Sequence, residues 1–213
     1  MARSWPGRAV GLGSKSVGAA SHSVARRVAA GYALLATLAI GLALALRDGV
    51  PWVHPEPWLS LGTTESVLLS AAGGLGFALL LVFFTRVAVS RYAWARRLHL
   101  ELRPVARELG LADILILAGL SSLGEELLFR GLLAPWLGVI GSALLFGLAH
   151  QIRGPSRWVW AGWATLVGLG LGGLFAATGS LLGPLIAHAV VNAKNLSYLR
   201  DHEPVAPTSG QPA

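Results

Sequence analysis

The stretch ADILILAGLSSLGEELLFRGLL, residues 112–133, decides the fold class of this chain. A helix needs roughly 20 mostly apolar residues to cross a bilayer, and this stretch is long and apolar enough. It nevertheless carries two adjacent carboxylates, Glu125 and Glu126, with Arg130 one helical turn later. Ionised side chains are expensive in hydrocarbon, so they usually face the interior of a bundle and mark a working site. The stretch therefore predicts a membrane helix that also carries function.

The composition extends this prediction to the whole chain. Its 213 residues are 54% hydrophobic and 13% charged, whereas soluble domains carry roughly 25% charged residues. Further apolar runs lie at 28–46, 66–84, 136–150, 158–176 and 181–199. These runs are continuous rather than alternating, which argues against a β-barrel. We predict an all-α, polytopic membrane helical bundle of about six transmembrane helices.

Four segments are expected along the chain. Residues 1–27 predict a flexible basic cytoplasmic tail, and 28–110 predict two transmembrane helices followed by a cytoplasmic amphipathic segment. Residues 111–199 predict a core of four helices, the candidate catalytic part because it holds the intramembrane charges, and 200–213 predict a disordered tail. The first apolar run is longer than the roughly 7–15 residues typical of a signal peptide, which favours a retained helix over a cleaved one.

The basic residues indicate the orientation of the bundle. The net charge is +7, and the lysines and arginines cluster before the first span and after the second, fourth and sixth. By the positive-inside rule, both termini are then cytoplasmic. The basicity is explained by topology and contact with the lipid bilayer, so we expect no nucleic-acid partner. The chain has no cysteine, which excludes disulfides, thiol nucleophiles and thiolate metal sites.

The carboxylates of residues 112–133 are expected to play different roles. Glu126 and Arg130 lie four residues apart on one helix face, within ion-pairing reach. Glu125 is rotated from Glu126 by about 100° and has no partner on its own helix. We therefore interpret Glu126 and Arg130 as a fixed structural pair and Glu125 as the candidate general base.

Two later apolar segments carry the matching polar groups. His150 ends the fourth span with Phe146 one turn before it, and His188 and Asn192 share one face of the sixth span. Glu125 and His150 together can bind and deprotonate a water, while an imidazole and a carboxamide can donate hydrogen bonds to an oxyanion. A lone buried histidine is more often structural, but the joint pattern predicts a peptide-hydrolysis site.

Glu125 and His150 are predicted to lie at different depths below the hairpin that joins their helices. Pro135 predicts a tight hairpin between the third and fourth spans. At 1.5 Å per residue, Glu125 then lies about 15 Å below the hairpin and His150 about 22 Å below it. The groups can meet only if a helix tilts, the chain bends near Gly124, or the hairpin is displaced from the surface.

The three motifs resemble those of the CAAX protease and bacteriocin-processing family, also called the Abi family. EELLFR at 125–130 resembles its EExxxR motif, FGLAH at 146–150 its FxxxH motif, and HAVVN at 188–192 its HxxxN motif. The ordered set is specific, and the chain is more similar to bacterial members than to the eukaryotic enzyme. The resemblance implies a glutamic-type intramembrane endopeptidase in the bacterial inner membrane, acting on a membrane-embedded or membrane-anchored protein or peptide.

The resemblance also implies a role for each motif residue. Glu125 and His150 would activate the water, and His188 and Asn192 would stabilise the oxyanion, with no cofactor. The structural and positioning residues would be Glu126, Arg130 and Phe146.

Three alternatives stay open at this point. Glu125, His150 and His188 match a His₂Glu zinc set, although the sequence has no HExxH motif. The chain can instead be a non-enzymatic bacteriocin-immunity or scaffold protein, or a proton-coupled transporter that uses the same side chains as a relay. Within the protease family, a myxosortase-like group that processes C-terminal tails is a further possibility.

Overall fold

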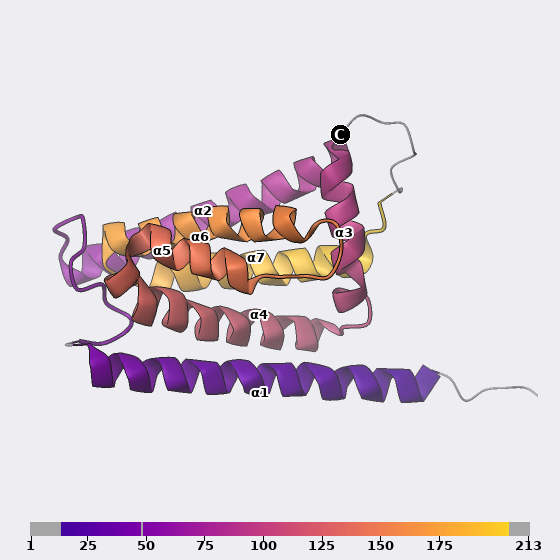
Figure 1. The fold of residues 1–213 in the computed structure, drawn as a ribbon, viewed down its shortest axis with the longest axis horizontal. Helices are drawn as coiled ribbons and strands as arrows, with labels where there is room; N and C mark the ends of the chain where they lie inside the picture. Colours follow the sequence, from indigo (N-terminus) through magenta and orange to yellow (C-terminus); the bar gives the residue numbers. More distant parts are fainter. Residues whose placement is uncertain (1–13, 48, 205–213) are drawn as a thin grey trace, which may run out of the picture.

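The computed structural model describes residues 14–47 and 49–204, with side chains from residue 25 onward. Over these residues the chain is helical, with no strand beyond an isolated bridge between Val53 and Ser180. The elements are α1 (Ser14–Leu46), α2 (Thr63–Arg91), α3 (Ala93–Ala106), α4 (Leu111–Glu126), the π-helix η1 (Leu127–Leu133), α5 (Ala134–Ala149), α6 (Arg157–Thr178) and α7 (Leu182–Asp201) (Figure 1). The predicted all-α class is confirmed.

Several helical stretches in the described residues are suited to lipid. Four are long and apolar enough to cross a membrane: Ala25–Leu46, Thr63–Arg91, Leu111–Ala149 and Arg157–Thr178. Their outward faces expose large apolar side chains such as Leu38, Leu80, Ile140 and Leu166. Lipid covers such faces without penalty, whereas monomeric soluble proteins rarely expose large contiguous apolar patches. The chain is therefore a helical membrane protein.

The third of these stretches folds back on itself, and its turn does not lie at Pro135 as predicted. Pro135 is in the first turn of α5, where a missing N–H is tolerated. The break is at Gly138, whose φ of 68° and ψ of 175° are open to glycine. Gly138 follows Glu125 by 13 residues and precedes His150 by 12. Both side chains therefore lie at a similar depth, roughly 18–20 Å from the turn.

α7 departs from the predicted sixth span in its setting. It is not among the stretches apolar enough to span on composition, because it carries His188, Asn192 and Lys194. α2, α4 and α6 surround it, and a Cβ on Gly74 of α2 would lie only 2.2 Å from the carbonyl oxygen of Gly183. A helix enclosed by protein can carry polar residues because they face the bundle interior.

α1 begins at Ser14 rather than at residue 28, so the second half of the predicted 1–27 tail is helical. Residues 1–13 of that tail, and 205–213 of the predicted C-terminal tail, lie outside the described residues.

α3 lies across one end of the bundle, the end at which α1 begins and α7 finishes (Figure 1). Its inner face buries Ala95, Leu98 and His99, as expected for an amphipathic helix. Glu101 accepts hydrogen bonds from the backbone N–H and the hydroxyl of Ser156, at 3.2 and 2.9 Å. These bonds attach α3 to the loop that leads from His150 into α6.

Candidate active site

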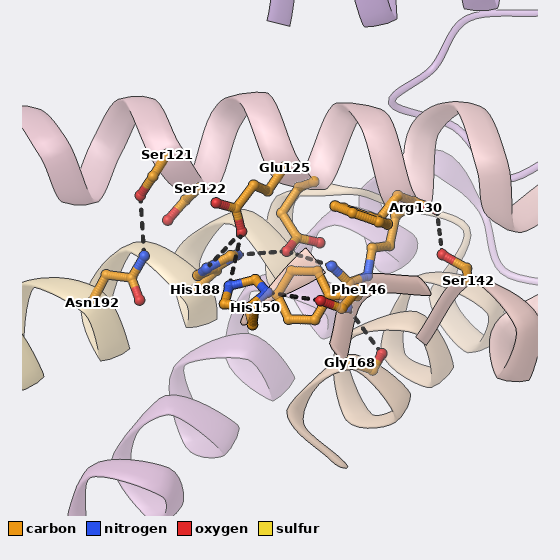
Figure 2. Close-up of polar contacts among 12 residues, drawn as sticks. Ser121, Ser122, Glu125, Arg130, Ser142, Phe146, His150, Gly168, His188 and Asn192 are labelled. Carbon is orange, nitrogen blue, oxygen red and sulfur yellow. Dashed lines mark hydrogen bonds and ion pairs between the residues drawn. The ribbon is translucent and has the colours of Figure 1, made fainter. Parts of the chain in front are cut away.

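The structure brings Glu125 together with both histidines (Figure 2). Glu125 Oε2 lies 3.5 Å from His150 Nε2 and 3.7 Å from His188 Nε2. Three elements meet here, since Glu125 is on α4, His150 follows α5 and His188 is on α7. Glu125 Oε2 is buried and has no hydrogen-bond partner among the described residues. A small polar molecule placed between the three groups can therefore bond to all of them.

Glu126 joins two partners rather than one. Its Oε1 accepts a hydrogen bond from Arg130 Nη1 at 2.9 Å and another from His188 Nδ1 at 2.7 Å. Arg130 also donates to the carbonyl of Gly168 at 3.0 Å. The predicted ion pair is present, and Glu126 has a further partner in His188 that helical spacing alone did not indicate. Glu126 holds the ring of His188 directly, because α7 packs against this face of α4.

The hydrogen bonds of the two imidazoles define their tautomers. His150 Nδ1 lies 2.7 Å from the carbonyl oxygen of Phe146, and His188 Nδ1 faces the Glu126 carboxylate. Both partners are acceptors, so each Nδ1 carries a proton. The Nε2 atom of each ring faces Glu125. It carries a lone pair when the ring is neutral and an N–H donor when the ring is protonated.

Phe146 packs among the charged groups. Its ring centroid is 4.5 Å from the Arg130 guanidinium and 4.3 Å from the His150 ring, and the ring meets His188 edge to face at 5.7 Å. The ring thus lies between the buried cation and the imidazoles and limits the orientations open to them. This placement suits the positioning role expected for Phe146.

The π-helix η1 follows Glu126 directly and carries Arg130. Segments of this type are frequent at functional sites, because the wider turn redirects side chains and leaves carbonyls without regular partners. Ser142 donates to the carbonyl of Phe129 at 2.6 Å, and Arg47 donates to that of Gly131. Side chains outside η1 thereby satisfy its backbone. The structure thus differs from the regular α-helix predicted for this stretch.

Asn192 lies one turn after His188 on α7, and its side chain reaches α4. Its Nδ2 donates to the hydroxyl of Ser121 at 3.1 Å. Ser121 is a site residue that the motif analysis missed, although it lies four residues before Glu125 on the same helix face. That four-residue spacing was the feature of the sequence that could have identified Ser121.

A cavity of about 320 Å³ connects the site to one end of the bundle. Glu125, His150, His188 and Asn192 line it together with apolar side chains, and it extends to Leu102 and Val105 of α3. Tyr32 of α1 also lines it, and sequence reasoning had assigned no role to that residue. Its lining residues thus run from the polar groups of the site to α3 at the end of the bundle.

The three side chains that meet at the site are also of the types that bind metal ions. Glu125, His150 and His188 supply the ligand types of a catalytic zinc site. In the described part of the chain, however, no three His, Cys, Asp or Glu side chains are grouped so as to hold a metal ion.

Comparison with known proteins places the motifs in a family. Residues 107–194 match the family model described as type II CAAX prenyl endopeptidase, Rce1-like. A curated relative, the uncharacterized protein YpbD of Bacillus subtilis (strain 168), is 34% identical over 80 residues, which are 38% of this chain and 42% of that protein. No solved structure matches the chain. The family resemblance is confirmed over the matched segment, which contains all three motifs.

Proposed function

Because residues 107–194 carry a core of the Rce1-like CAAX endopeptidase family, we propose that the protein is an intramembrane endopeptidase. It hydrolyses a peptide bond in a membrane-embedded or membrane-anchored protein or peptide. The observation that carries this proposal is the convergence of Glu125 with His150 and His188, at 3.5 and 3.7 Å, on the wall of one cavity.

Glu125 and His150 activate the water in this mechanism. A water between Glu125 Oε2 and His150 Nε2 can bond to both, and its oxygen attacks the carbonyl carbon of the substrate. The proton of the water passes to the Glu125 carboxylate and then to the nitrogen of the leaving amine as the C–N bond breaks. Glu125 therefore acts first as general base and then as general acid.

His188 and Asn192 stabilise the oxyanion. The second hydrogen on Asn192 Nδ2 is free to reach a substrate oxygen, because Ser121 accepts only one. Glu125, Glu126 and Arg130 together carry one excess negative charge, which a protonated His188 balances. His188 then presents an Nε2–H donor to the developing charge, and such preorganised donors contribute strongly to catalysis.

We also propose an orientation of the bundle in the membrane and a route by which the substrate enters. The beginning of α1, the whole of α3 and the end of α7 share one end of the bundle (Figure 1), and basic residues concentrate in these segments. The protein is then a multi-pass protein of a bacterial inner membrane with both termini cytoplasmic. The cavity reaches α3, so the substrate enters from the cytoplasmic end.

The proposed partners are the lipid bilayer and the substrate, with no nucleic acid, and the reaction requires no metal. Asn192, one turn after His188, supports the metal-free assignment, because its amide donates to Ser121 and is placed to donate to an oxyanion rather than to ligate an ion.

Replacing Glu125 tests the proposal. Glu125→Gln keeps the shape of the side chain and removes the base, and Glu108→Gln on the exposed surface is the matched control. Protein termini in the membrane proteome are compared between cells that carry the parent protein and cells that carry each variant. We expect a processed terminus with the parent and with Glu108→Gln but not with Glu125→Gln. Identical termini in all three strains, with retained biological activity, would indicate a scaffold or immunity protein instead.

A further inference from the structure

α1 lies outside the segment that matches the family, yet it contributes to the cavity wall. Its buried stripe consists of small residues: Ala25, Ala29, Ala36, Ala39 and Ala43. Spacings of three and four residues place such a stripe along one helix face, and small side chains let two helices approach closely. Tyr32 lies on the same face between Ala29 and Ala36, and it is a large aromatic residue in a row of alanines.

α1 and α4 approach each other closely beside the candidate base. A Cβ on Gly124 would lie 2.9 Å from the carbonyl oxygen of Tyr32 and 3.5 Å from its Cδ1. Gly124 therefore leaves room for the backbone of α1 at Tyr32, with the Tyr32 ring beside it, and Glu125 is the next residue. The side chain of Tyr32 lines the same cavity as Glu125 and both histidines, and its hydroxyl interacts electrostatically with the Glu125 carboxylate.

We propose that Tyr32 is a positioning residue for Glu125, and that α1 thereby completes the active site. Its O–H donates to the carboxylate and holds Oε2 toward His150 and His188. A packing role alone requires only the ring, whereas a hydrogen bond to a carboxylate stabilises the ionised form that acts as base. The assignment of a base to Glu125 rests on the proposed function, but the contact itself does not.

The first test measures protonation of Glu125 without any substrate. Dicyclohexylcarbodiimide modifies protonated carboxyl groups within membranes, and mass spectrometry locates the modified residue. Tyr32→Phe removes the hydroxyl and keeps the ring, so the carboxylate should take up a proton at higher pH. We expect about tenfold more labelling of Glu125 at a pH where the parent protein is barely labelled, as for loss of one hydrogen bond to a charged group.

The controls isolate the effect to this contact. The other charged or titratable groups around Glu125 are Arg130, His150 and His188, and all are unchanged in Tyr32→Phe. Tyr92→Phe removes a hydroxyl from an exposed tyrosine and should label like the parent. Glu125→Gln should abolish the labelled peptide. Thermal unfolding should be nearly the same for the parent and Tyr32→Phe, because the ring contact with Gly124 is retained.

A second test measures the rate of substrate cleavage. The substrate is the membrane protein whose processed terminus is found with the parent strain. Tyr32→Phe should lower kcat about tenfold with little change in KM. Equal labelling profiles for the parent and Tyr32→Phe would overturn the inference. A shifted profile in a protein that cleaves nothing would leave Tyr32 as a partner of Glu125 while refuting the protease function. Shifted labelling with reduced kcat supports both.

Discussion

Arg130→Ala probes the buried charges that hold the site together. Arg130 and Glu126 are 1% and 0% exposed, so removing the guanidinium leaves a carboxylate without its cation inside the bundle. Breaking a buried pair in this way costs about 3–5 kcal/mol. The lost cation–π contact with Phe146, at 4.5 Å, adds about 1 kcal/mol, which the remaining bond from His188 to Glu126 partly offsets.

The expected loss of about 3–5 kcal/mol corresponds to a fall in Tm of about 6–20 °C for a chain of this size. Unfolding in detergent can be followed by intrinsic fluorescence, since the chain has eight tryptophans. Arg107→Ala is the matched control, because Arg107 pairs with Glu108 on the exposed surface. Surface pairs contribute about 0–1 kcal/mol, so its Tm should change little.

A compensating double variant separates charge from packing. Glu126→Gln combined with Arg130→Met removes both charges and should recover a large part of the lost Tm. It should not recover cleavage, because His188 loses the carboxylate that orients it. An Arg130→Ala protein as stable as the parent would refute the assignment of this pair as a structural lock.

Further predictions concern metal, hydrogen bonding and pH. Exhaustive chelation should leave the cleavage rate unchanged, and a loss of activity restored by zinc would contradict the metal-free mechanism. Ser121→Ala should lower kcat up to about tenfold while Tm stays nearly constant, because it frees the amide of Asn192 that the hydroxyl orients; an unchanged kcat would exclude this role. Burial lowers the pKa of His99 on α3, so the unfolded chain takes up a proton first as the pH falls below about 6.5. The free energy of unfolding, measured by denaturant titration, should therefore decrease as the pH falls in the parent, and less steeply in His99→Gln. The same pH dependence in both proteins would contradict this role of His99.

The sequence by itself determined the class of the protein and the list of reactive groups. Long apolar runs can satisfy their backbone in lipid only as helices, so hydropathy indicates the fold class. Spacing within one helix is set by 3.6 residues per turn, which is why the pairing of Glu126 with Arg130 followed from four-residue separation alone. The motifs likewise identified Glu125, His150 and His188 before any arrangement was known.

The tertiary structure decided how these groups meet. The chain reverses at Gly138 instead of Pro135, which brings Glu125 and His150 to the same depth. The bond from His188 to Glu126 depends on where α7 packs, and the position of Tyr32 beside Gly124 depends on a close approach of α1. Contacts between helices depend on where the chain turns and how closely two backbones approach, and helical periodicity carries no information about either.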